Sequence, residues 1–207
     1  MTKNKAKWLA AYLKRHQINP KSRPYSSQYS HTEIRESLAA MSFGKCFYCE
    51  RKLTDSEAEV DHFVEVAERP DLAFAWHNLC WSCRDCNRKK QSNLQVDVTE
   101  CLDPCGAVDV PEEHLSFNQE YIRPRFDSQK GSRTIQKYRL DRDQLNYARV
   151  KQLREFDRLL RVIMKKQIRE GRQQMTGREK EYLLSFGQAD QAFSLMFQVY
   201  LAELELA

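Results

Sequence analysis

The sequence of 207 residues has no apolar run long enough to cross a bilayer, which excludes a protein built around membrane-spanning helices. Its first residues are basic, but they lack the sustained apolar stretch and the small-residue cleavage site of a secretory signal. Internal repeats and low-complexity tracts are also absent. Since 41% of the residues are hydrophobic and 30% are charged, we expect a packed core and a well-solvated surface. The lack of an export signal, together with seven cysteines, leads us to expect a reducing cytoplasm.

The seven cysteines are an odd number, which argues against a fully paired disulfide framework. Four of them form two Cys-x-x-Cys pairs, Cys46/Cys49 and Cys83/Cys86. This spacing lets two adjacent thiolates of each pair bind one tetrahedral Zn²⁺. The alternative is a set of four buried or redox-active thiols. In a chain without an export signal, the matched pairs favour a structural zinc ion.

Three cysteines remain outside these pairs. Cys80 lies in a short apolar run and is predicted to be a buried core thiol. Cys101 and Cys105 flank a Leu-Asp-Pro triplet, where a second metal would lack other obvious ligands. We therefore expect all three to be structural.

Charge is distributed unevenly along the chain, although the net charge is only +5. Residues 1–30 contain seven Lys or Arg and no acid, and residues 133–172 contain thirteen Lys or Arg against five acids. The segment between them is acidic. Basic segments of this kind suit a polyanion, but solvated helices have the same composition, so charge alone does not decide between the two.

Hydrophobic periodicity predicts a mostly helical chain around a small β region. The helices are expected at 5–17, 32–43, 84–92, 141–170, 177–186 and 189–205. The runs at 58–66 and 78–81 are β-prone. Residues 19–30 are rich in Ser, Tyr and Pro and are predicted to be a linker. Residues 93–131 contain three of the six prolines, so we expect an irregular segment with one short strand at most.

Between the two cysteine pairs lie residues suited to phosphodiester hydrolysis. Asp61 offers a hard oxygen ligand for Mg²⁺ or a similar ion, and His62 can take a proton from water. Asn87, on the expected helix 84–92, can supply a second oxygen ligand. Asn78 is expected to hold the loop that aims His62. Because neighbouring side chains on a strand point to opposite faces, Asp61 and His62 can serve one phosphate only where the strand ends.

Two basic residues of the same helix, Arg88 and Lys90, are predicted to contact a nucleic-acid backbone. Each candidate residue also has an ordinary structural explanation. An Asp-His dipeptide is common, and asparagines cap helices and turns. The ordered combination of cysteine pair, Asp-His, Asn, cysteine pair, Asn and Lys within residues 46–90 favours the catalytic interpretation.

This order resembles the HNH family of ββα-metal nucleases, in which a β-hairpin and a helix grip one divalent ion. The resemblance implies that His62 is the general base, that Asp61 and Asn87 bind Mg²⁺ or Mn²⁺, and that Asn78 braces the loop. It also implies products with a 5′-phosphate and a 3′-hydroxyl. The last family position is Asn rather than His. Many members also have a proline shortly after the Asp-His-x core, where this sequence has Val64-Glu65, so the path of the loop departs from the family pattern.

A narrower resemblance covers most of the chain. The segments GKCFYCE, VDHF, AWHNLCWSCRDCNRKK and TIQKYRLDRDQL look like the HNH nucleases of Septu and certain retron anti-phage systems. Such nucleases are similar to the partner of an ABC-type ATPase, which implies that a complex with an ATPase restrains or releases cleavage. The expected fold class is α+β, with a zinc-stapled ββα-metal core in a mostly helical surround.

Three regions are expected on this basis. They are an N-terminal helical arm (1–44), a zinc-bound nuclease core with an irregular segment (45–132) and a C-terminal helical region (133–207). The leading hypothesis is a metal-dependent DNA endonuclease acting in defence. The alternatives are a zinc-stapled nucleic-acid-binding adaptor without catalysis and an HNH nuclease directed at RNA such as tRNA. Only the Asp61, His62 and Asn87 set separates enzyme from adaptor, and it favours the enzyme.

Overall fold

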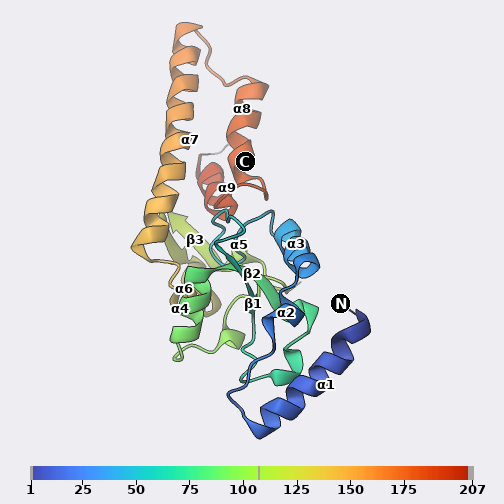
Figure 1. The fold of residues 1–207 in the computed structure, drawn as a ribbon. Helices are drawn as coiled ribbons and strands as arrows, with labels where there is room; N and C mark the ends of the chain where they lie inside the picture. Colours follow the sequence, from blue (N-terminus) through green and yellow to red (C-terminus); the bar gives the residue numbers. More distant parts are fainter. Residues whose placement is uncertain (1, 107, 205–207) are drawn as a thin grey trace.

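The structure is a computed structural model that describes residues 2–106 and 108–204. It combines helices with two small sheets and is 56% helical, so the predicted α+β class is confirmed. Figure 1 shows an elongated molecule, with α1 (Thr2–Ile18) at one end and the long α7 (Asp143–Arg169) at the other. None of the helices in the described ranges is long and apolar enough to cross a membrane.

A β-hairpin followed by a helix lies between these two ends. Strands β1 (Ala58–His62) and β2 (Leu79–Cys83) pair antiparallel, and α4 (Arg84–Ser92) begins at the next residue. The pairing sets Asp61 opposite Cys80 and His62 opposite Leu79. The predicted helix at 84–92 is confirmed, and the predicted β-prone run at 58–66 ends as a strand at His62.

Alternation along β1 assigns its side chains to two different neighbours. One face of the hairpin packs against α3 (Thr32–Met41) in a buried cluster of Ile34, Leu38, Ala58, Val60, Leu79 and Trp81. The opposite face carries Glu59 and Asp61 toward α4. Since neighbouring strand residues point to opposite sides, the apolar residues anchor the hairpin while the acidic residues face the helix.

The N-terminal segment packs on the loop that joins the two strands. The Tyr12 ring of α1 is fully buried against Val66, Ala73 and Phe74, and its hydroxyl donates to the Val66 carbonyl at 3.3 Å. A short helix, α2 (Ser26–Tyr29), follows in the stretch predicted to be a linker. The loop contains two 3₁₀ turns, η1 (Pro70–Leu72) and η2 (Trp76–Asn78).

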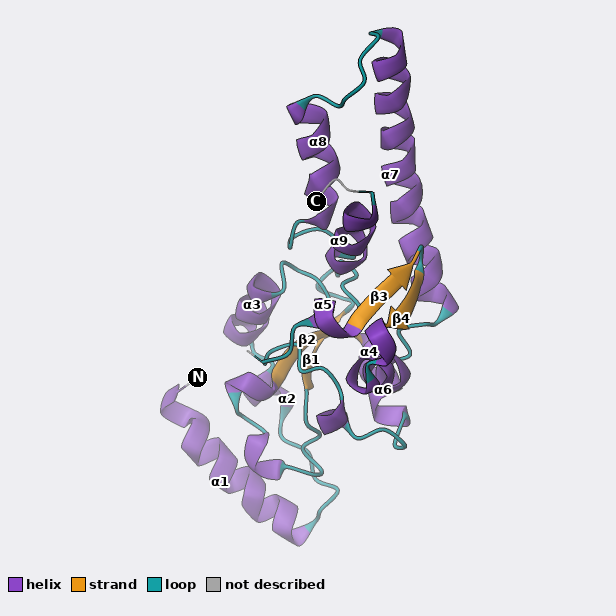
Figure 2. Cartoon of the chain, turned by 180° about the vertical axis from the view of Figure 1, so that it is seen from behind, coloured by secondary structure: helices purple, strands orange, loops and turns teal. Residues whose placement is uncertain are grey.

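The segment 93–131 is more regular than predicted. It contains η3 (Val98–Glu100), α5 (Pro111–His114), β3 (Leu115–Asn118), β4 (Tyr121–Pro124) and η4 (Arg125–Asp127). The expectation of one strand at most is wrong, because β3 and β4 form a second antiparallel hairpin (Figure 2). The strands are only four residues long, and Leu115, Phe117 and Ile122 are their buried residues, so the alternation in the sequence is too brief to predict a sheet.

The C-terminal part begins with α6 (Gln129–Tyr138), which the sequence did not predict, and continues into α7. Helix α8 (Gly177–Leu184) begins with a capping box and continues into η5 (Ser185–Gly187). Helix α9 (Ser194–Glu203) starts five residues later than the predicted 189–205, because Phe193 before it has the left-handed φ of 56°. The predicted end at Glu205 lies outside the described residues.

One hydrophobic core joins the cysteine-rich hairpin to the C-terminal helices. The largest buried cluster contains the paired cysteines together with Phe156 of α7 and Phe197 of α9. A polar contact adds to it, since the carboxylate of Glu50 accepts from the Ser194 hydroxyl at 2.6 Å and from the Lys45 ammonium at 3.1 Å. The boundary predicted at 132/133 falls inside α6. The three-region division stays a prediction, while the shared core shows that the C-terminal helices support the hairpin.

Candidate metal centre and catalytic pocket

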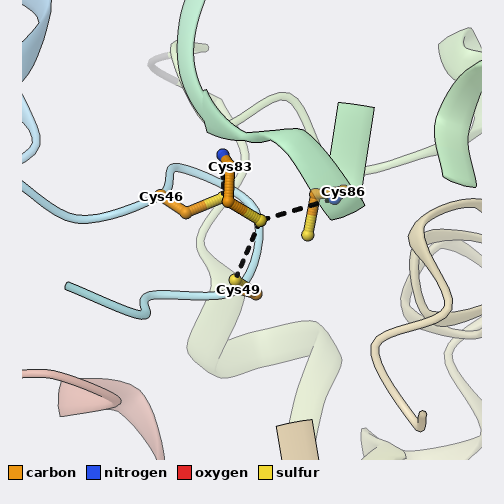
Figure 3. A group of neighbouring side chains, drawn as sticks. All are labelled: Cys46, Cys49, Cys83 and Cys86. Carbon is orange, nitrogen blue, oxygen red and sulfur yellow. Dashed lines mark hydrogen bonds between the residues drawn. The ribbon is translucent and has the colours of Figure 1, made fainter. Parts of the chain in front are cut away.

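The four paired cysteines meet in one buried cluster (Figure 3). Cys46 and Cys49 come from the loop before β1, Cys83 ends β2, and Cys86 lies in the first turn of α4. All four sulfur atoms lie within 4.8 Å of one another, and the Sγ atoms of Cys49 and Cys83 are 3.9 Å apart. The expected convergence of the two pairs is therefore observed.

The separation of the sulfurs fits a single tetrahedral metal ion. Metal–sulfur bonds of about 2.3 Å in a tetrahedron place sulfurs roughly 3.8 Å apart. The backbone N–H of Cys83 donates to the Cys46 sulfur at 3.3 Å, and that of Cys86 donates to the Cys83 sulfur at 3.4 Å. Hydrogen bonds from the neighbouring thiols lower the pKa of Cys83 well below its usual value. Cys83 can therefore present thiolate, the form that binds metal.

An arginine of the C-terminal region completes the surroundings of this cluster. The guanidinium of Arg142, which is half-buried, donates to the Cys86 sulfur at 3.4 Å. Four thiolates around a divalent ion carry a net charge of about −2, so a nearby cation offsets part of that charge. The cysteine cluster and the segment entering α7 are thus electrostatically matched.

The other three cysteines do not form a second metal centre in the part of the chain that the structure describes. The Sγ atoms of Cys80 and Cys105 are 3.6 Å apart, and no third ligand of the His, Cys, Asp or Glu type joins them. The buried Cys101 thiol donates to a backbone carbonyl at 3.6 Å. All seven cysteines are free thiols, so the structural role predicted for these three fits their positions.

A cavity of about 250 Å³ lies between β1, α4 and the N-terminal segment. It brings together four residues predicted from the sequence and several that were not; those used below are Arg23, Tyr29, Asp61, His62, Asn87 and Lys90. Asn78 and Arg88 do not line it. Since the residues come from three separate stretches, the fold assembles this cavity, and no single motif contains it.

Asp61 is 5% exposed and has a cation as its main partner. The Lys90 ammonium donates to its two carboxylate oxygens at 3.1 and 2.9 Å, and also to the His62 carbonyl. The Tyr48 hydroxyl donates to the same carboxylate at 2.7 Å, and burial raises the pKa of Tyr48, which keeps that proton in place. A buried carboxylate requires such compensation.

The prediction that Lys90 contacts a phosphate does not agree with this position. Lys90 is 1% exposed, and its ammonium is used by Asp61 and by the His62 carbonyl. The physical reason is that Lys90 lies on the face of α4 turned toward the hairpin, three residues after Asn87. Arg88 is exposed on the same helix and remains available to a polyanion.

His62 is the last residue of β1, where a strand can redirect its side chain toward a loop. Its Nε2 lies 2.9 Å from the Ala73 carbonyl. A carbonyl oxygen only accepts hydrogen bonds, so Nε2 carries the proton and Nδ1 keeps its lone pair. The Tyr29 ring lies 4.5 Å from the imidazole and helps to fix its orientation. Burial lowers the pKa of His62, which favours the neutral imidazole that can accept a proton.

Asn78 fastens the loop that follows His62. Its side-chain oxygen accepts from the Val64 N–H at 2.8 Å, and its amide nitrogen donates to the Val64 carbonyl at 3.1 Å. Its own carbonyl accepts from the Phe63 N–H at 2.9 Å. Asn78 is therefore outside the cavity but holds the two residues after His62, which is the geometry expected of a loop-bracing residue.

Asn87 reaches the cavity from α4, and a strand residue sets its orientation. Its amide nitrogen donates to the Glu59 carboxylate at 2.9 Å, which identifies its other terminal atom as the oxygen. That oxygen accepts from the Gln91 amide at 2.8 Å. Glu59 is also paired with Arg84 at 3.1 Å. Asn87 and Asp61 both line this cavity, so the two residues predicted to bind a divalent ion border one space.

The donor set fits a hard divalent ion. Mg²⁺ commonly takes one or two carboxylates and completes its octahedron with waters and substrate phosphate oxygens. Asp61 supplies a buried carboxylate, and Asn87 supplies an amide oxygen. The Asp61 carboxylate accepts hydrogen bonds from Lys90 and from Tyr48, so an ion that binds there would find the carboxylate already oriented by both side chains.

Sequence reasoning missed four residues around this pocket. Arg23 and Tyr29 belong to the stretch predicted to be a linker. Tyr48 lies inside the first cysteine pair, where its ring stacks on Tyr138 at 4.1 Å. Glu59 precedes Asp61 by two residues, and the alternation of a strand could have placed both carboxylates on one face. The other three give no local signal, because only the tertiary fold brings them to the site.

Comparison with known proteins gives one family and a small group of relatives. Residues 46–93 match the family model described as HNH endonuclease. The chain is similar to the Septu protein PtuB of Bacillus thuringiensis, with 32% identity over 120 residues, covering 56% of this chain and 45% of the relative. It is also similar to the Septu protein PtuB of Bacillus mycoides (strain KBAB4), with 29% identity over 160 residues, covering 62% of this chain and 54% of the relative.

A third relative comes from a different type of system. It is named "Retron Vc95 putative HNH endonuclease", from Vibrio cholerae serotype O1 biovar El Tor, and is 30% identical over 108 residues. The match covers 50% of this chain and 53% of the relative. The chain therefore spans about half the length of the curated relatives it matches.

Proposed function

We propose, on the premise that residues 46–93 match the HNH endonuclease family model, that this protein is a metal-dependent nuclease that hydrolyses DNA phosphodiester bonds. The observation that carries the proposal is the cavity shared by Asp61, His62 and Asn87. An imidazole that can accept a proton and two residues with oxygen atoms suited to a hard cation line one space of about 250 Å³, which supports the proposal. Hydrolysis of a phosphodiester requires an activated water and a cation held in fixed geometry.

His62 acts as the general base in this proposal. Its Nδ1 lone pair accepts the proton of the attacking water, since the Nε2 proton is committed to the Ala73 carbonyl. That same hydrogen bond stabilises the imidazolium formed by the transfer. The lowered pKa of His62, caused first by burial, keeps the base neutral before the reaction. Asn78 supports the role indirectly by fixing Val64 in the loop behind the imidazole.

Asp61 and Asn87 would hold Mg²⁺ or Mn²⁺, which supplies positive charge to the phosphate and to the leaving oxygen. Tyr48 and Lys90 donate hydrogen bonds to the Asp61 carboxylate and fix its orientation within the buried site. Glu59 accepts from the Asn87 amide nitrogen, which orients the amide so that its oxygen points away from the strand that carries Glu59. These contacts are the supporting interactions that a precise ligand pair requires.

Arg23 offers a further cation at the same cavity. Its side chain is exposed and lines the wall that faces His62, while its backbone carbonyl accepts from the Arg15 guanidinium at 3.3 Å. A guanidinium matches the geometry of phosphate oxygens. In the proposed mechanism, Arg23 contacts a nonbridging oxygen of the scissile phosphate and helps to orient it.

The four-cysteine cluster binds a structural Zn²⁺ in this proposal. Four thiolates in a closed tetrahedral set favour zinc, and they leave no position for a reacting water. Cys83 and Cys86 connect directly to the start of α4, whereas Cys46 and Cys49 precede β1. Zinc would therefore tie the hairpin to the helix that carries Asn87, and would stabilise a module with a small core.

The relatives support a role in anti-phage defence. Two are named Septu PtuB proteins and one belongs to a retron, so we infer that this nuclease is the effector of a multi-component defence system. The proposed partner is an ABC-type ATPase that restrains or releases cleavage. Action in the cytoplasm would agree with seven free thiols, because a reducing compartment keeps cysteines unpaired.

Plasmid cleavage tests the catalytic assignment. The protein is incubated with supercoiled DNA and Mg²⁺ or Mn²⁺, alone and with the neighbouring ATPase, and compared with His62→Ala and His77→Ala variants. His77 is exposed and does not line the cavity, so it is a matched histidine control. Loss of a general base costs about 10²- to 10⁴-fold in rate. If His62→Ala cleaves as fast as His77→Ala, the mechanism is wrong.

The two alternatives from the sequence give different results in the same experiment. A zinc-stapled adaptor binds DNA in a salt-dependent way but yields no nicks with any divalent ion. An RNA-directed enzyme leaves the plasmid intact and cleaves a tRNA added in parallel. The ion and base serve either phosphate backbone, so the substrate arms of the experiment, rather than the site, separate DNA from RNA.

A further inference from the structure

The solvent side of α7 carries a regular row of cations. Its members, called the α7 basic stripe below, are Lys151, Arg154, Arg158, Arg161 and Lys165. They follow one another at alternating intervals of three and four residues, which places all five on the same helical face. With a rise of about 1.5 Å per residue, the stripe is roughly 21 Å long.

The stripe lies opposite the face of α7 that packs into the core. The buried residues of this helix are Leu145, Arg149, Leu153, Phe156 and Ile163, whereas all five members of the stripe are exposed. Figure 1 shows α7 projecting away from the hairpin region, so its outer side is open to a large ligand. The stripe is therefore not required to hold the fold together.

Carboxylates neutralise only a small part of this positive charge. Arg158 pairs with Glu155 at 2.6 Å, and it is the one member of the stripe with an ion pair among the described residues. Asp157 borders the stripe and accepts a long hydrogen bond from the Tyr200 hydroxyl, at 3.5 Å. A hollow of about 320 Å³ runs along the same face and is lined by Arg154, Arg161 and Lys165 among others.

An aromatic residue extends the stripe toward the nuclease core. Tyr147 is exposed four residues before Lys151, whose ammonium lies 4.5 Å from the centre of its ring. Arg142, immediately before α7, contacts the Cys86 sulfur. The basic face thus begins about two and a half helical turns after the residue that joins α7 to the cysteine cluster.

We propose that the α7 basic stripe is a contact surface for the phosphate backbone of a nucleic acid, which it holds outside the catalytic cavity. The inference deepens the proposed function, because the ligand is the same polymer that the cavity would cleave. Five cations over roughly 21 Å face about six nucleotides of a strand at 3.4 Å each. Contacts of this kind carry no base information, so the stripe raises affinity without selecting a sequence.

The location of the other basic groups favours this surface. Lys90 is buried against the hairpin, where it pairs with Asp61, so only the exposed basic residues of α4, such as Arg88, can contact a nucleic acid. A nuclease that must hold a long polyanion therefore needs cations elsewhere, and α7 provides the longest regular row of exposed ones in the described helices.

Charge reversal at three central positions tests the proposal. A His62→Ala background is used throughout, so that a 30-base-pair duplex stays intact while binding is followed by fluorescence anisotropy with Mg²⁺ present. The test variant carries Arg154→Glu, Arg158→Glu and Arg161→Glu. The matched control carries Lys166→Glu, Arg178→Glu and Lys180→Glu, which lie on the same projecting arm but off the face of the stripe, are exposed and change the net charge equally.

The expected result is a stripe variant that binds roughly tenfold or more weakly than the control at low salt, with a salt dependence shallower by about three units of slope. A variant with glutamine at the same three positions should also bind more weakly than the parent. If all variants keep the melting temperature of the parent, misfolding is excluded as the cause. Equal binding by the stripe variant and the control overturns the proposal, as does absence of duplex binding by the parent.

A second assay separates this proposal from the proposed function and from a protein ligand. Plasmid cleavage by the protein with His62 intact measures the nuclease activity alone, so the absence of cleavage counts against the proposed function. Equal duplex binding by the stripe variant and the control counts against the stripe. If the stripe variant binds the duplex normally but no longer copurifies with the coexpressed ATPase, then an acidic protein face, not nucleic acid, occupies the stripe and the proposal is wrong.

Discussion

Replacing Asn78 by alanine gives the sharpest test of how the loop behind His62 is held. The substitution removes one hydrogen bond accepted from the Val64 N–H at 2.8 Å and one donated to the Val64 carbonyl at 3.1 Å. A longer contact to the Leu72 carbonyl, at 3.4 Å, is lost with them. Since Asn78 is 1% exposed, water does not readily replace the amide.

The expected loss of stability follows from the groups left behind. A buried donor or acceptor without a partner costs about 1–3 kcal/mol, and Val64 keeps one of each. Val64 is only half-buried, so its backbone recovers part of this cost by contacting water. We therefore expect Asn78→Ala to lower the free energy of unfolding by about 2–4 kcal/mol.

Urea denaturation of the full chain measures this change, and plasmid cleavage below the unfolding transition measures its effect on catalysis. Asn118→Ala serves as the control, because Asn118 is exposed at the end of β3. Cleavage should fall at least tenfold in Asn78→Ala, since a loosened loop no longer aims the imidazole. A stability loss below about 0.5 kcal/mol, or cleavage equal to that of Asn118→Ala, would refute the reasoning.

Three further predictions concern the supports of the site. Prolonged chelation should release one zinc ion per chain, make four additional thiols reactive toward a colorimetric reagent and lower the melting temperature; thiol reactivity unchanged by chelation would contradict the zinc assignment. Lys90→Met should cost about 3–5 kcal/mol in denaturant unfolding because it leaves Asp61 buried without its cation, whereas the exposed Lys89→Met should cost little. Glu50→Ala should cost about 1–3 kcal/mol because the Ser194 hydroxyl loses its acceptor, and equal melting of variant and parent would count against that tie.

The hairpin, its helix and the metal cluster were predictable because their signals are local. Two Cys-x-x-Cys pairs fix the sulfur positions by spacing alone, and the expected helix 84–92 has the bounds that the structure gives to α4. The β-prone run was expected at 58–66, and β1 covers only its first five residues, since it ends at His62. In these elements, neighbouring residues supply most of the interactions that determine the structure.

The rest of the site depends on contacts between distant segments. Arg23 and Tyr29 lie in a stretch whose composition is typical of a linker, and only the packing of α1 and α2 brings them to the cavity. The burial of Lys90 was missed because helical periodicity places it on a face but does not say what that face meets. The hairpin of β3 and β4 was missed because four-residue strands show too little alternation.

Helix α4 connects the metal cluster to the catalytic pocket through residues that follow one another closely. Cys86 joins the sulfur cluster, Asn87 lines the cavity, and Lys90 binds Asp61 one turn later. A rotation or shift of this helix would therefore move one proposed ion ligand, Asn87, together with the lysine that holds the other, Asp61. Arg142 lies in the segment that enters α7 and donates to the Cys86 sulfur of α4. A displacement of α7 would therefore act on α4 through this contact. The Arg142–Cys86 contact thus connects the segment that enters α7 to the first turn of α4, next to Asn87.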